Sequence, residues 1–149
     1  MTLTLERIYD RSVYFYIYDL FVGTHVNVVD EFPIQPLTTP TVSVDYKNLR
    51  PLQIELGNTK RLKMNSWYVD VFAQNKSQRD EIGFTILDAL ETCIPVYDYN
   101  LGFPPTVVPQ LGCLEVRDIS MDIHRVLPQL VDKLHYRATI SFTATYNQL

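Results

Sequence analysis

The chain has 149 residues, of which 46% are hydrophobic and 20% charged, a composition typical of one ordinary globular domain. This length excludes a second full-sized domain, so we expect a single domain over residues 1–149. A chain of this size can bury a core without metal or disulfide staples. The 13 basic and 17 acidic residues give a net charge of −4, which argues against avid, sequence-blind binding to nucleic-acid phosphates.

The first part of the chain predicts a helix followed by an irregular arm. Apolar residues recur at steps of three and four over 4–22, Thr2 or Thr4 can cap this run, and Gly23 can end it. We therefore expect a helix at 4–22. From 26 to 40 the pattern breaks up around three prolines, which predicts a linker or an extended arm.

Strand patterns follow the arm. Three strand-like runs are expected, at 41–46, 52–56 and 61–73. Gly57-Asn58 lies between the last two and is a hairpin turn signal. In the third run the alternation of apolar residues slips by one at Asn65-Ser66, which predicts a β-bulge there.

A second helix is expected at about 76–92, with Asn75 or Ser77 as its cap. Its apolar stripe should be buried and its charged positions should stay in water. The stripe comprises Ile82, Ile86, Ala89 and Leu90. The residues expected to be exposed to solvent are Gln78, Arg79, Asp80, Glu81 and Asp88. A long loop at about 94–112 follows, and loops of that length in compact domains are usually functional or mobile.

Two more strands are expected, at 113–125 and 134–146. In the first strand the alternation of apolar residues shifts by one position at Arg117-Asp118. The second strand alternates strictly, with Phe142 on its apolar side and threonines on the other. The order helix, three strands, helix, two strands predicts an α+β domain. We expect an antiparallel sheet of about five strands, whose apolar face is covered by the two flanking helices and whose Thr-rich face is exposed or bound to a neighbour.

Cys93 and Cys113 are the two cysteines, and their spacing fits neither a zinc site nor a redox motif. We expect two buried, reduced thiols. The N-terminus has no signal-peptide layout, and no stretch approaches the length of a membrane span. A protein made in a reducing cytosol is the default expectation.

Residues for catalysis are few. The three histidines are His25, His124 and His135, and Asp122 and His124 would share one face of a strand, where they could form an acid–base dyad. An ordinary solvated strand face explains the same pattern. The sequence has no G-x-S-x-G, no Gly-rich phosphate loop and no H-E-x-x-H, so we expect no enzyme.

The loop residues Asp98 and Asn100 offer oxygen ligands, but the carboxylate spacing of a calcium loop is missing. We therefore expect no bound metal and no cofactor. Tyr97 and Tyr99 are expected to pack this loop against the domain.

Basic residues gather in one predicted hairpin. Residues 47–63 hold five of the 13 basic residues and one acid, Glu55, so the remainder carries eight basic and 16 acidic residues. The five are Lys47, Arg50, Lys60, Arg61 and Lys63. A basic hairpin on an acidic body suits head-to-tail contact between copies, which can close into a ring. Alternatively, these basic residues are ordinary solvent-exposed strand ends and turns, or they contact phosphates weakly.

Ten tyrosines, seven phenylalanines and one tryptophan are more than one core of this size readily encloses. Aromatic residues are enriched at protein interfaces, so this excess favours an assembly subunit. Cores of β-rich domains also use many aromatic residues.

Four blocks of the sequence stand out, PLQIELG (51–57), WYVDVFA (67–73), QRDE (78–81) and VYDYN (96–100). They resemble small virion proteins of tailed bacteriophages, which sit in the neck or at the head-proximal end of the tail. The order of the expected elements is also similar to the tail-terminator (tail-completion) family, and the resemblance spans about residues 40–146. The family implies no catalytic residue.

The resemblance implies a structural protein of the phage neck that forms a ring, expected to be hexameric, and joins the tail tube to the head connector. Double-stranded DNA would pass through this ring without specific binding, and no membrane would be involved. The chain would be assembled in the bacterial cytoplasm and end in the virion. A tube or baseplate subunit is one alternative, and a small hydrolase or binding domain that uses Asp122 and His124 is another.

We expect contacts with neighbouring subunits or partners at the basic hairpin, at the Pro-rich segment 33–40 and at the long loop, since loops carry contacts while a sheet supplies rigidity. The expected interface residues are Lys47, Arg50, Lys60, Arg61, Lys63, Tyr97, Asp98, Tyr99, Asn100 and Phe103.

Overall fold

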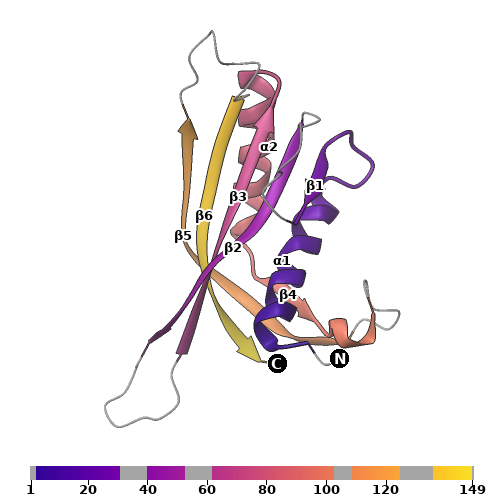
Figure 1. The fold of residues 1–149 in the computed structure, drawn as a ribbon, viewed down its shortest axis with the longest axis vertical. Helices are drawn as coiled ribbons and strands as arrows, with labels where there is room; N and C mark the ends of the chain where they lie inside the picture. The colour runs from indigo at the N-terminus through magenta and orange to yellow at the C-terminus, as the bar shows by residue number, and fades with distance from the viewer. Residues whose placement is uncertain (1–2, 31–39, 53–61, 103–108, 125–135, 149) are drawn as a thin grey trace.

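A computed structural model describes residues 3–30, 40–52, 62–102, 109–124 and 136–148 (Figure 1). The elements run in the order α1 (Leu5–Leu20), β1 (Asn27–Val29), β2 (Thr41–Leu52), β3 (Leu62–Ala73), α2 (Lys76–Leu90), β4 (Ile94–Tyr97), the single 3-10 turn η1 (Tyr99–Leu101), β5 (Gln110–His124) and β6 (Tyr136–Gln148). The α+β class expected from the sequence is confirmed.

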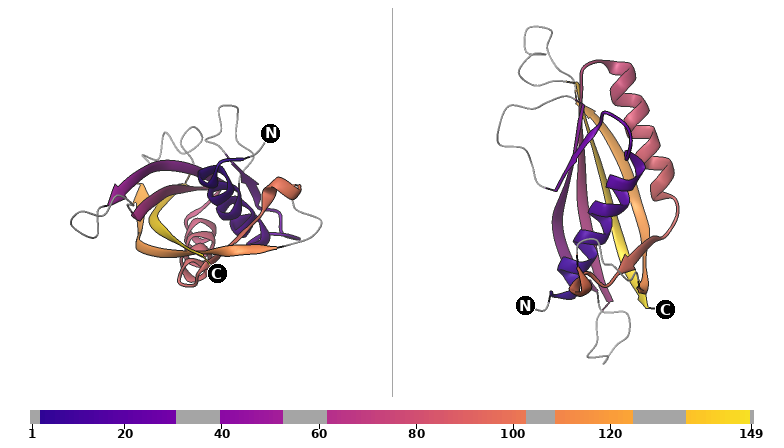
Figure 2. Two further views of the ribbon diagram at one scale, coloured as in Figure 1. Left: turned by 90° about the horizontal axis from the view of Figure 1, so that it is seen from below. Right: turned by 90° about the vertical axis from the view of Figure 1, so that its right-hand side faces the viewer.

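The strands form one six-stranded sheet in the order β1-β2-β3-β6-β5-β4. The expectation of about five antiparallel strands is wrong in two respects. Asn27–Val29, inside the expected arm, forms β1 and pairs with β2 in parallel, so the sheet is mixed. Ile94–Tyr97, inside the expected loop, forms β4 and pairs with β5. The sheet curls around α1, as the left view of Figure 2 shows from below.

Strand β2 continues from Thr41 to Leu52, so residues 47–51, which the sequence pattern leaves between two predicted strands, belong to it. The rest of the second predicted strand, at 53–56, lies outside the described residues. The register of β2 against β3 shifts between Tyr46 and Asn48, so the bulge lies in β2 and not at Asn65-Ser66. The apparent slip in β3 has a different cause. Asn65 is a buried polar residue that accepts a hydrogen bond from the Tyr46 hydroxyl at 2.8 Å, so it occupies a core position where the alternation predicts an apolar residue. The predicted turn at 57–58 lies outside the described residues.

The parity slip predicted in β5 is confirmed. The register against β6 shifts between Arg117 and Ser120, and Asp118 adopts a positive φ of 54°. A positive φ next to an extra residue is typical of a bulge, which bends the strand. The first part of β5 pairs with β4, and in its second part the end of the Met121 side chain lies against Gly83 of α2.

Helix α1 begins at a cap predicted from the sequence. The Thr4 side chain accepts from the Arg7 N–H at 3.4 Å, and Gly23, with a φ of +81°, follows the last turn. The hydroxyl of Tyr16 donates to the carbonyl of Ala89, near the end of α2, at 2.6 Å. This bond joins the two helices directly.

Helix α2 is capped by Asn75, whose side chain accepts from the Gln78 N–H at 2.8 Å. Ile82, Ile86 and Leu90 are buried as predicted, while Ala89 is half-buried. Arg79 departs from the prediction. Its side chain is buried instead of solvated, and it donates to the carboxylate of Asp80 at 3.1 Å. A guanidinium stays buried at low cost only when a carboxylate pairs with it.

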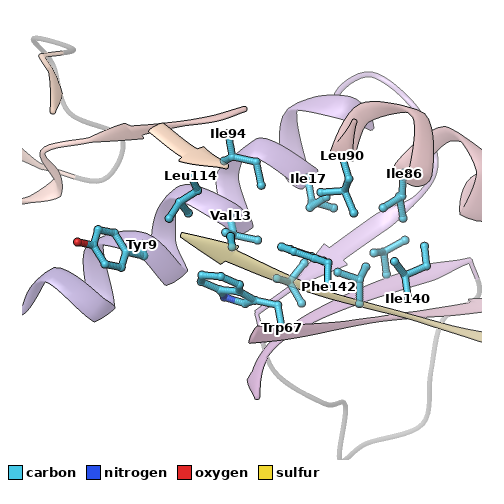
Figure 3. Close-up of a cluster of buried hydrophobic side chains, with 14 of the residues drawn as sticks. Tyr9, Val13, Ile17, Trp67, Ile86, Leu90, Ile94, Leu114, Ile140 and Phe142 are labelled. Atoms are coloured by element: carbon cyan, nitrogen blue, oxygen red, sulfur yellow. The ribbon is translucent and has the colours of Figure 1, made fainter. Parts of the chain in front are cut away.

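Both helices pack on one face of the sheet, which we call the inner face; the opposite face is the outer face. Figure 3 shows side chains of α1 and α2 on one side of the core, beside Ile94 and Leu114 of β4 and β5, and Trp67, Phe142 and Ile140 of the central strands on the other. At its centre Trp67 stacks on Phe142, with ring centroids 5.6 Å apart, and Tyr46 meets the indole edge-on. Phe142 is buried, as the alternation in β6 predicts.

Candidate assembly surface

The basic residues of the predicted hairpin that the structure describes are exposed. Lys47 and Arg50 lie in the second half of β2, and Lys63 lies near the start of β3, where the two strands pair. The ammonium of Lys47 lies 4.8 Å from the ring centroid of Tyr68, a cation–π contact on the outer face. Lys60 and Arg61 lie outside the described residues.

Lys63 is already engaged within the chain. Its ammonium donates to the carboxylate of Glu6, at the start of α1, at 3.1 Å. The pKa of Glu6 is lowered, chiefly by a hydrogen bond from its own backbone N–H and further by Lys63. Both side chains are partly exposed, so the pair contributes little to stability. It does orient Lys63 toward α1.

The expected loop interface is largely folded onto α1. The ring of Tyr99 is buried and stacks on Phe15, with centroids 5.4 Å apart. The backbone N–H of Tyr97 donates to the Ser12 hydroxyl at 3.4 Å. The prediction that the two tyrosines pack this loop against the domain is therefore confirmed. Burial raises the pKa of Tyr99 to about 12, and Asp19 adds to the rise.

The polar residues of the same loop also bond internally. The side chain of Asp98 accepts from the Asn100 N–H at 3.0 Å and caps η1. The Asn100 side-chain oxygen accepts from the Leu3 N–H at 2.7 Å, which ties the loop to the start of the described chain. Asn100 remains exposed, and Phe103 lies outside the described residues.

Asp122 and His124 share the outer face of β5, but their surroundings do not form an acid–base dyad. The Nε2 atom of His124 lies 2.7 Å from the hydroxyl of Thr139. That hydroxyl donates its single proton to Asp70 at 2.6 Å, so His124 must be the donor in the first contact. A histidine nitrogen that holds its proton cannot accept one from Thr139. The arrangement is a structural network, completed by Arg137, which donates to Asp70 at 2.9 Å.

The cysteines do not lie where the sequence predicts. Cys93 is exposed and Cys113 is half-buried, and no disulfide joins them. A hydrogen bond with Cys93, followed by burial, raises the pKa of the Cys113 thiol. Cys93 directly precedes β4 and Cys113 is opposite Pro95 of β4, so both thiols lie at this edge of the sheet.

Among the described residues, no cluster of three or more His, Cys, Asp or Glu side chains could hold a metal ion. A groove of about 490 Å³ between the end of α1 and the start of α2 brings together only two titratable groups, His25 and Glu81. His135 lies outside the described residues. Neither α1 nor α2 is long and apolar enough to cross a membrane.

The structure also exposes large apolar side chains that the sequence pattern did not single out as contacts. They are Leu5, Tyr18, Val22, Leu49, Tyr68, Phe84, Leu101 and Ile123. Leu49 and Ile123 lie on the inner face near the two edges of the sheet, so alternation alone assigns them to the core. Their exposure depends on which strand lies beside them, and the sequence of one strand does not contain that information.

No protein-family model matches the chain, and no curated protein matches it. Solved structures that are similar in fold include the following two. The sheath/tube terminator of an extracellular contractile injection system, in its extended state, matches with a TM-score of 0.53 and 10% identity over 100% of this chain, which spans 58% of the terminator's length. A chain of a native gene transfer agent virion matches with a TM-score of 0.49 and 16% identity, over 95% of this chain and 93% of the other. The fold expected from the resemblance to tail terminators is thus confirmed.

Proposed function

We propose that this chain is a structural protein of a phage or phage-like tail, which assembles as a ring of six copies at the head-proximal end of the tail. There it ends the tail tube and joins it to the head connector. The observation that carries the proposal is the fold, which the chain shares over its whole length with an injection-system terminator. A shared fold does not fix a function, so the proposal also uses the resemblance of the sequence blocks.

The charge distribution supports a ring of this kind. A channel through which DNA passes should not bind phosphates tightly, and a net charge of −4 on each copy repels them. The exposed Lys47 and Arg50 lie on the outer face of β2. They can therefore meet an acidic surface on a neighbouring copy.

Imaging of particles tests this function directly. Particles made by cells that encode the chain would be labelled through an epitope on the C-terminus of this protein and viewed by electron microscopy. We expect label at the junction of head and tail, and separate heads and tails when the gene is deleted. Label along the tube or at the distal end would instead support a tube or baseplate subunit.

The alternative of a small hydrolase is less well supported, because His124 donates to Thr139 and is not free to act as a base toward it. His124→Ala should leave the assembly of particles unchanged. Its matched control is His25→Ala, in the groove beside α2. Loss of a measurable hydrolytic activity in the first variant alone would favour the enzyme.

A further inference from the structure

The sheet has two edges that other described strands cover only in part. β1 pairs with β2 over Thr41–Ser43, and β4 pairs with β5 between Gln110 and Leu114. Among the described strands, none pairs with the outer edge of β2 after Ser43 or with that of β5 after Leu114. Such edges present backbone N–H and C=O groups that can pair with another chain.

The directions of the long strands allow these two edges to meet. β2, β3, β6 and β5 alternate in direction, because each consecutive pair in the sheet is antiparallel. β5 of one copy placed beside β2 of the next would continue the same alternation. The contact joins two different surfaces, so it is heterologous and can repeat around a ring.

Opposite charges lie on the outer face at these two edges. Arg50 is opposite Met64, and Asp122 is opposite Thr139, and both partners lie on the outer face of the sheet. Both charged side chains are exposed, and neither forms an ion pair with any described residue.

Apolar side chains match on the inner face. Leu49 is opposite Asn65, and Ile123 is opposite Ala138, which are both core positions. Yet Leu49 is 38% exposed and Ile123 is 50% exposed. Among the described strands, none lies beside either residue on the open edge of its strand.

From these two matches we infer that β5 of one copy pairs antiparallel with β2 of the next, with Leu49 opposite Ile123 and Arg50 opposite Asp122. This inference rests on the proposed ring and names its interface. In this register β1 and β4 do not overlap the contact. β1 pairs with β2 only as far as Ser43, which lies beyond the residue opposite His124, and β4 pairs with β5 only as far as Leu114, which lies beyond the residue opposite Leu52. Pro51 has no N–H to donate, so the ladder loses one bond at that position.

Crosslinking tests the pairing. The full chain would carry Leu49→Cys and Ile123→Cys in a Cys93→Ser, Cys113→Ser background, and purified particles would be oxidised and run under denaturing conditions. We expect a ladder of multimers, because directly opposed side chains in a sheet are close enough to form a disulfide. The matched control replaces Ile123→Cys by Phe84→Cys, an exposed site on α2, and should give monomer only.

The outcomes separate the inference from the function it rests on. Three results would overturn the edge pairing. They are monomer alone from particles that contain the chain, a ladder equally strong in the control, and a crosslink to a protein of another size. Absence of the chain from all particles would overturn the proposed function as well.

Charge reversal gives a second test that needs no disulfide. Arg50→Asp and Asp122→Arg should each reduce the yield of joined particles, because each places like charges opposite one another. The double variant should restore the yield, since it exchanges the two charges. The pairing would be contradicted if both single variants gave the same yield of joined particles as the unaltered chain. It would also be contradicted if the double variant gave a yield as low as that of the worse single variant.

Discussion

The indole N–H of Trp67 donates to a carboxylate oxygen of Asp10 over 3.1 Å and so joins the core of the sheet to α1. Burial raises the pKa of Asp10, and the hydrogen bond from Trp67 offsets this rise only in part. A carboxyl group with a higher pKa in the folded state than in the unfolded state lowers stability as the pH rises through that interval.

Asp10→Asn should therefore raise the free energy of unfolding at pH 7, because the amide keeps an oxygen acceptor for Trp67 and removes the buried charge. The gain should appear as the pH rises above the ordinary pKa of an aspartate and reach its full size above the raised value. Below both values the two proteins should be equally stable. Urea denaturation at a series of pH values measures this difference, with Asp30→Asn, in the partly exposed pair with Arg11, as the control.

A gain from Asp10→Asn that is the same at every pH would show that the charge of Asp10 is not its cause.

Phe142→Ala should lower the free energy of unfolding by about 3–5 kcal/mol, because it leaves a cavity beside Trp67. Phe142→Asp should yield no folded protein, since it places an unpaired charge in the core. Chemical denaturation and circular dichroism measure both effects. The control Phe84→Ala removes a ring that is 54% exposed and should change stability by no more than about 0.5 kcal/mol. Equal losses at positions 84 and 142 would refute this view of the core.

Two glycines should respond differently to the same added methyl group. A Cβ at Gly112 would meet the backbone oxygen of Asn147, which cannot move without breaking the sheet, so Gly112→Ala should cost about 1–3 kcal/mol. A Cβ at Gly83 would meet only the mobile end of Met121, and alanine favours the helix by about 1 kcal/mol. Gly83→Ala should therefore have a small net effect. Thermal unfolding of the two variants side by side checks the contrast, and a larger loss at Gly83 would contradict it.

Arg137→Ala should destabilise the chain by about 1.5–3 kcal/mol, since it leaves the buried Asp70 carboxylate with fewer donors. The matched control is Arg117→Ala, whose pair with Glu115 at 3.5 Å is exposed and should be worth less than about 1 kcal/mol. Equilibrium denaturation separates the two values. Similar losses would mean that Asp70 finds other partners when Arg137 is removed.

The sequence predicts the elements that carry their own signals. The capping residues Thr4 and Asn75 locate the starts of both helices, and the alternation around Phe142 identifies β6. β1 and β4 were missed because strands of three and four residues are too short for a pattern, and their pairing depends on the neighbouring strand.

The candidate surface could be predicted only in part. The charges of Lys47 and Arg50 are visible in the sequence, and the structure places both in solvent. The exposed state of Leu49 and Ile123 could not be predicted, because alternation assigns a residue to a face and does not say whether a further strand covers it.

The two helices end by different means. α1 is followed by a glycine in the left-handed conformation, whereas the last turn of α2 has no such residue and instead receives the Tyr16 hydroxyl on the carbonyl of Ala89. Replacing Tyr16 by phenylalanine would leave that carbonyl with only the Thr92 hydroxyl, at 3.1 Å. The final turn of α2 is therefore held by a distant part of the chain, and it should unravel first if α1 is displaced.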